Sequence, residues 1–222
     1  GSETTKRTLV RHGAVEPFFG VKVGDLKPLQ KQLKGQQELA LELFATKIGD
    51  AQYLAGLVAD GARMSRKELD RWASTASWWM ISAYSVAWVA CEHPEAVAIA
   101  TKWTASKTEP VAVAGWSTLG AVASVWPDER LPIKEFRDLL KRCAQSIHSE
   151  KNRVKSAMNG FVIAVGTYVA PLADEAFATA KSIGGVEVDV GETACKVPLA
   201  VDAITKARRG LPVAPKRKAA RC

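Results

Sequence analysis

The sequence predicts an all-α protein, folded as a HEAT/armadillo-like α-solenoid of paired helices whose curvature leaves one concave face for binding. Apolar residues recur at spacings of three and four over most of the chain, glycine and proline separate the segments, and no stretch makes a convincing strand. Helical segments also come in pairs about thirty to forty residues apart, the period of HEAT and armadillo units. Because no repeated sequence accompanies that period, a compact helical bundle is the alternative.

Start and stop signals place the individual elements. Ser65 and Glu68 form a capping box, and several helical segments open on a proline, which the first turn of a helix tolerates well. The stretch 186–190 alternates with period two, but it is short and flanked by glycine, so we expect an extended loop there. We expect helices over residues 3–16 (one short helix), 26–34, 39–44, 50–60, 65–72, 77–88, 94–103, 111–125, 132–147, 152–168, 172–183 and 198–206.

Charge divides the chain into a body and a tail. The net charge is +8, yet no acid follows Asp202, while seven bases do: Lys206, Arg208, Arg209, Lys216, Arg217, Lys218 and Arg221. We expect residues 1–2 to be an expression scar, 3–206 to form a single helical-repeat domain, and 207–222 to be a basic C-terminal tail. Such a tail either grips phosphates without sequence preference or stays a solvated end.

Several function classes lack their signatures. No uninterrupted apolar run reaches membrane-spanning length, and the cysteines, at 91, 143, 195 and 222, have neither CxxC spacing nor a neighbouring histidine pair. There is also no glycine-rich phosphate loop and no nucleophile elbow. We therefore expect a monomer of the reducing cytoplasm (bacterial-type cytosol or nucleoid), without metal, cofactor or membrane contact.

The most unusual stretch is 77–88, which holds three tryptophans and a tyrosine. Read as a helix, Trp79, Ala83 and Val86 share one stripe, and Trp78, Ile81, Ser85 and Trp88 lie near another. Large aromatics bury much area while their N–H or O–H groups still need a partner. The stretch is either a helix in the middle of the core or an aromatic wall against which a base or sugar lies.

Basic residues at helix starts are the candidate phosphate ligands, since these ends present unpaired N–H groups. Lys151, Arg153 and Lys155 open one helix, which can also be an ordinary solvated start. Asn159, in the same otherwise apolar helix, either bonds a neighbouring backbone or faces a cleft. The full set of predicted phosphate ligands is Lys22, Lys27, Lys151, Arg153, Lys155, Lys216, Arg217 and Lys218.

Four stretches are similar to a known family: Phe18-Phe19-Gly20-Val21; Ser77-Trp78-Trp79 followed by Ser85-Val86; His93-Pro94-Glu95 with Lys102-Trp103; and Lys155-Ser156-Ala157-Met158-Asn159-Gly160-Phe161-Val162. Over roughly residues 16–206 the chain resembles the DNA alkylation repair family of HEAT-like repeat DNA glycosylases. The resemblance implies a solenoid that cradles double-stranded DNA, alkylated or distorted, by its backbone. It implies a lesion-facing set of Trp79, Tyr84, Trp88, Trp116, Asn159 and Phe161.

The chain departs from the family where the chemistry is done. The position that matches the family's catalytic aspartate, four residues after Trp79, is Ala83. The family's cleft arginine would fall near Val113, and its second cleft tryptophan at Gly160 or Phe161. Asp50, Asp60 and Glu92 could stand in for the missing carboxylate, but each sits at a helix end, where capping is expected. No catalytic residue is therefore assigned.

These observations predict a protein that binds damaged or distorted duplex DNA through backbone contacts and an aromatic cleft without excising bases. One alternative is an active glycosylase that releases N3- or N7-alkylpurines by a different residue placement. A second alternative is a helical-repeat scaffold whose concave face binds protein.

Overall fold

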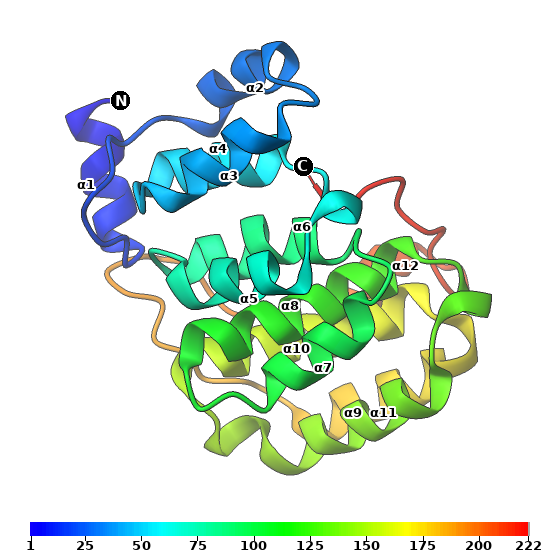
Figure 1. The fold of residues 1–222 in the computed structure, drawn as a ribbon. Helices are drawn as coiled ribbons and strands as arrows, with labels where there is room; N and C mark the ends of the chain where they lie inside the picture. The colour runs from blue at the N-terminus through cyan, green and yellow to red at the C-terminus, as the bar shows by residue number, and fades with distance from the viewer. Residues whose placement is uncertain (222) are drawn as a thin grey trace.

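The computed structural model describes residues 1–221 as a helical protein (Figure 1). No strand forms in that range, so the all-α prediction is confirmed. No single helix in it is long and apolar enough to cross a bilayer; only the bent pair Asn152–Tyr168 and Ala170–Ile183, with 113° between its helices, passes by length and composition. The α-helices are α1 (Glu3–Arg11), α2 (Val23–Gln32), α3 (Gln37–Ala45), α4 (Gly49–Val58), α5 (Arg66–Thr75), α6 (Ala87–Ala90), α7 (Ala96–Thr104), α8 (Glu109–Val125), α9 (Ile133–Ser146), α10 (Asn152–Tyr168), α11 (Ala173–Ile183) and α12 (Ala200–Arg208).

The helices lie in two layers. Helix α4, the π-helix η2 (Ile81–Val86) with α6, then α8, α10 and α12 pack successively against one another and form the inner layer. Helices α3, α7 and α11 each pack on the inner helix of their own pair, while α9 joins α11 in the outer layer. In Figure 1, α5, α7 and α9 lie in front of α8 and α10. This is the layered, repeating contact pattern of a solenoid.

Aromatic packing holds successive pairs together. Trp72 on α5 stacks on Phe44 of α3, with ring centroids 3.9 Å apart and planes within 8°. Further along, Trp116 on α8 and Phe136 on α9 both contact Phe161 of α10, at 5.4 and 5.5 Å. Each of these side chains is fully buried, so each contributes a large apolar area to a core that runs from pair to pair.

Glycine permits close approaches within the inner layer and between the two layers. A Cβ at Gly56 on α4 would lie 2.5 Å from the Cβ of Ser85 on η2. A Cβ at Gly115 on α8 would lie 2.7 Å from the backbone nitrogen of Thr104 on α7. Both distances are below van der Waals contact, so these helices pack at a separation that only glycine allows.

Local sequence signals predict the capping box and the extended segment correctly, but not the conformation of residues 77–88. The capping box of Ser65 and Glu68 is confirmed, and residues 186–190 are extended without forming a strand. The stretch 77–88 is not one α-helix: a turn precedes η2, and α6 follows it. A π-helix has a wider turn than the α-helical wheel assumes, and such turns are frequent at functional sites.

The basic tail packs on the body instead of standing free. We call residues 211–221 the C-terminal strap. Its backbone donates from Ala214 to the Thr167 carbonyl at the end of α10 (2.8 Å) and from Arg217 to the Ser124 carbonyl at the end of α8 (2.8 Å). The strap therefore runs along the C-terminal ends of inner helices and shields carbonyls that a helix leaves without partners.

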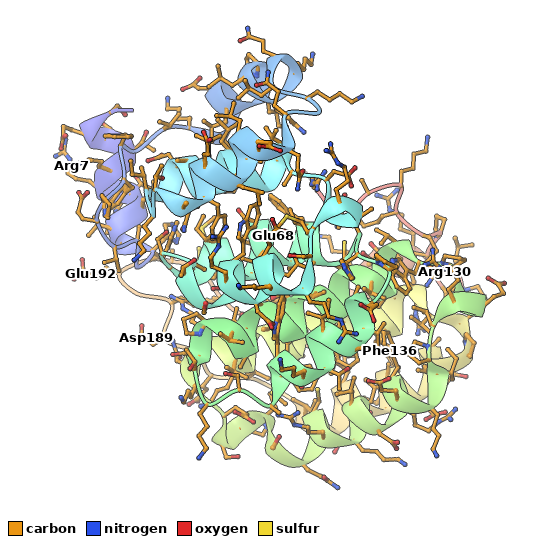
Figure 2. All side chains as sticks on the ribbon, in the orientation of Figure 1. Arg7, Glu68, Arg130, Phe136, Asp189 and Glu192 are labelled. Carbon is orange, nitrogen blue, oxygen red and sulfur yellow. The ribbon has the colours of Figure 1, made fainter. Side chains whose placement is uncertain are left out.

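A linker, residues 184–199, joins α11 to α12 along the opposite ends of these helices. The Asn152 side chain holds it by accepting from the Asp189 backbone (2.7 Å) and donating to the Asp189 carbonyl (2.8 Å). Lys151 is the N-cap residue of α10, and its side chain makes no capping bond. Asp189 and Glu192, labelled in Figure 2, mark the part of the linker that passes beside α1.

Candidate nucleic-acid interface

A cleft of about 380 Å³ opens on the inner layer between η2, α8 and α10. Small residues make the room for it: Ser117 and Gly120 on α8 face Ala157 and Gly160 on α10. The linker borders the cleft through Val197 and Pro198, and the strap borders it through Arg217 and Ala220. Segments that are far apart in sequence thus enclose one cavity, within the size range of ligand pockets.

Trp79 and Arg153 form one wall of the cleft. The guanidinium carbon of Arg153 lies 4.4 Å from the centroid of the Trp79 ring, a cation–π contact. The indole is fixed by a hydrogen bond from its Nε1 to the His12 carbonyl at the end of α1 (2.8 Å). Both residues line the same cleft, and Arg153 covers the indole face on which a base was expected to lie.

Arg153 is partly buried, but no described residue forms a hydrogen bond or ion pair with its guanidinium. Its pKa is lowered, chiefly because the side chain is partly buried, while the charges of Asp189 and Glu109 act to raise it. Within residues 1–221 its guanidinium makes neither a hydrogen bond nor an ion pair. A half-buried guanidinium without a carboxylate is an anion-binding group, since five donors are left for a ligand.

Tyr84 is the exposed aromatic of the cleft. Its side chain is 40 % exposed, and its ring centroid lies 6.2 Å from that of Trp79. The other aromatic candidates are placed differently. Trp88 packs inside the core against Tyr53 and Tyr84, and Trp116 and Phe161 are fully buried beneath the cleft. These three therefore support the walls instead of facing a ligand, because α6, α8 and α10 turn these large apolar side chains into the core.

Asn159 combines the two roles that the sequence left open. It lines the cleft, and its Nδ2 donates to the Pro198 carbonyl of the linker (2.9 Å). Its Oδ1 is buried without a donor among the described residues. The amide therefore ties the linker to α10 and keeps an unused acceptor next to the cavity.

The electrostatic character of the cleft is one-sided. No aspartate or glutamate is among its lining residues in the described chain, whereas Arg153 and Arg217 both are. Ala83, at the position expected to hold the family's catalytic carboxylate, contributes only a methyl group to the wall. The cleft thus attracts anions and repels cations.

Comparison with known proteins places this geometry in a family. The model of the family described as DNA alkylation repair enzyme matches residues 1–183. The chain belongs to this family. Two relatives are uncharacterised Listeria proteins: Lin0241 of Listeria innocua, 31 % identical over 202 residues, and Lmo0209 of Listeria monocytogenes, 30 % identical over 202 residues. Each alignment covers 89 % of this chain and 87 % of the relative.

A solved structure gives a more specific likeness. It belongs to a protein described as one of a new family related to the HEAT-like repeat DNA glycosylases, with affinity for branched DNA structures. The two chains superpose with a TM-score of 0.90 at 38 % identity, over 100 % of this chain and 94 % of the other. The HEAT-like fold inferred from the sequence is thereby confirmed.

Set against the family, the carboxylates considered as stand-ins for Ala83 lie outside the cleft. Asp50 holds the loop before α2 by accepting from the Phe19 and Val21 backbone nitrogens. Asp60 caps a short helix by accepting from the Ala62 nitrogen (3.0 Å). Glu92 accepts from Gly61 at 3.0 Å and pairs with the strap residue Arg221 at 2.8 Å. All three carboxylates have structural partners. Outside the cleft too, no cluster of three metal-ligating side chains occurs in residues 1–221.

The predicted phosphate-binding lysines do not line the cleft. Lys216 forms an ion pair with Asp128 (2.7 Å) and donates to the Ala123 carbonyl (2.9 Å), so it anchors the strap. Lys151 donates to the Lys107 carbonyl. The remaining lysines lie outside the cavity, at the start of α2 or α10 or on the exposed side of the strap: Lys22, Lys27, Lys155 and Lys218. Arg153 and Arg217 are the members of the predicted set that line the cleft.

Sequence reasoning missed the contributions of the linker and the strap to the cleft. Val197, Pro198 and Ala220 border the cavity, and His12 positions Trp79 from α1. Each of these contacts depends on how distant segments pack, and none has a local sequence signal.

Proposed function

We propose that this protein binds distorted or branched duplex DNA through its phosphate backbone and does not excise bases. The observation that carries the proposal is the charge of the cleft: within residues 1–221, two arginines without carboxylate partners line it and no acidic residue does. Support comes from the relative with affinity for branched DNA, which matches this chain along its entire length.

The same charge argues against cleavage of a glycosidic bond. When such a bond breaks, positive charge develops on the sugar, and a preorganised negative group must face it. Here the corresponding wall offers Ala83 and the nearby cation Arg153. Loss of a single well-placed stabilising group typically lowers the rate by about 10²–10³-fold, and a cation in the cleft adds repulsion.

Two measurements test the proposal. Fluorescence anisotropy compares a fully paired four-way junction with a linear duplex of the same length and base composition; the junction should bind more tightly, and affinity should fall steeply with salt. A base-release assay on methylated duplex should detect no 7-methylguanine above the enzyme-free rate. Equal affinity for the junction and the linear duplex would contradict the proposed preference for branched DNA. Release of 7-methylguanine by the parent protein, abolished in a Trp79→Ala variant, would establish the glycosylase alternative.

A further inference from the structure

We propose that the cleft holds a short unpaired stretch of DNA strand, whose phosphates are bound by Arg153 at one end and by Arg217 of the strap at the other. The proposal rests on the proposed function, since it names the DNA element that this cleft takes. It also makes the basic C-terminal segment a folded part of the binding site.

The dimensions of the cleft favour a single strand. Its lining follows α10 from Arg153 in the first turn to Tyr168 at the end, a rise of about 22 Å at 1.5 Å per residue. A cavity of about 380 Å³ spread along that length is narrow. A duplex therefore cannot enter it, whereas a strand of a few nucleotides can lie along it, since its phosphates recur every ~3.4 Å when stacked.

The strap presents one charge to the cleft and uses two others as anchors. Lys216 pairs with Asp128 at 2.7 Å, and Arg221 pairs with Glu92 at 2.8 Å. Between these anchors, the Arg217 backbone is bonded to Ser124, while its guanidinium borders the cleft without a hydrogen bond or ion pair in the described chain. A fixed backbone that carries an unpaired guanidinium is a pre-organised phosphate ligand.

Strap and body thus place two unpaired guanidiniums at opposite ends of the cleft. Arg153 stands at the N-terminal end of α10, and the strap crosses the C-terminal ends of α8 and α10. Between them lies the exposed ring of Tyr84, next to Trp79. Basic groups that follow a backbone and aromatic rings between them are the general features of single-strand binding sites.

The competing interpretation is that the inner layer contacts only paired DNA, with the cleft empty. The test uses three DNAs of matched length: a fully paired four-way junction, the same junction with three unpaired thymidines at the branch, and a linear duplex. The full-length protein is assayed by anisotropy, together with Arg217→Gln and a control, Lys206→Gln, which removes an equal charge from an exposed position on α12.

If the cleft takes unpaired nucleotides, the junction with thymidines binds at least about fivefold more tightly than the paired junction, the lower end expected for one stacked base. Arg217→Gln removes that advantage, while Lys206→Gln retains it. Equal affinity for the two junctions, or equal weakening of both by Arg217→Gln, overturns the inference. If instead neither junction binds more tightly than the linear duplex, the proposed function itself fails.

Discussion

Replacement of Arg153 by glutamine tests two roles of this residue: contact with a DNA phosphate and packing on the Trp79 ring. The guanidinium lies over Trp79 and has no ionic partner within residues 1–221, so its charge is available to a phosphate. Glutamine keeps most of the side-chain length and removes the charge. Lysine at the same position retains the charge and loses the planar, five-donor group.

Both effects have expected magnitudes. A hydrogen bond to a charged group is worth about 1.5–3 kcal/mol, so loss of one Arg–phosphate contact should weaken junction binding by roughly 10- to 150-fold. The slope of log K against log salt should become shallower by about 0.9, the contribution of one phosphate. The contact with Trp79 contributes about 1 kcal/mol to folding, which corresponds to about 2–4 °C in Tm.

Anisotropy titrations of the four-way junction with three unpaired thymidines, between about 50 and 200 mM salt, measure the affinity and the salt slope, and calorimetry measures Tm. Arg153→Lys should retain the salt slope while losing part of the affinity. Lys134→Gln, an exposed position on the outer helix α9, removes the same charge and should change neither. If Arg153→Gln left both affinity and slope as in the parent, Arg153 would contact no phosphate, and its position in the cleft would serve folding alone.

Three further predictions concern stability and reactivity. Asp128→Asn loses the ion pair that anchors the strap and should lower Tm by about 3–8 °C in calorimetry, whereas its exposed neighbour variant Glu129→Gln should leave Tm unchanged. The pKa of Glu68 is lowered by the Ser65 backbone N–H and then by its hydroxyl, so the stabilisation is present above the unfolded-state pKa and is lost as pH falls through the folded one. In urea unfolding, Glu68→Gln should therefore cost about 0.5–1 kcal/mol at pH 7 and progressively less below about pH 4. Burial raises the pKa of Cys91 to about 12, so in a Cys222→Ser background at pH 8 a thiol reagent should label the exposed Cys195 rapidly and Cys91 only on unfolding; rapid native labelling of Cys91 would contradict the packing.

Much of the fold could be predicted because its signals are local. Capping, as at Ser65, and apolar spacing within each helix act over a few residues, and they located most helices. The π-helix over residues 81–86 could not be predicted in this way. A wheel drawn at 3.6 residues per turn places Trp88 on another stripe than Trp79, and only the family resemblance put it in the lesion-facing set; in the structure it packs against Tyr53 inside the core.

The cleft was predictable only in part, because its members come from distant segments. Trp79 and Arg153 could be named since tryptophan density and a basic helix start are visible in the chain. Their contact could not be foreseen, because it depends on how the segment before η2 lies against the first turn of α10. The tail shows the same limit. Its charge predicts an anionic partner, but only the fold shows that Lys216 forms an ion pair with Asp128 while Arg217 lines the cleft.

The effect of Ala83, at the position where a carboxylate was expected, on the charge of the cleft depends on Arg153. Had the cleft merely lost an acid, it would be a neutral hollow with weak preference for any charged ligand. With a guanidinium over Trp79 and a second one on the strap, the sign of the potential is inverted relative to a site that must stabilise a cationic sugar. Such a site gains nothing from a cationic alkylated base and gains most from closely spaced phosphates. Branched DNA concentrates both phosphates and partly unstacked bases at one point, and that combination matches a cleft with cations at its ends and aromatic rings between them.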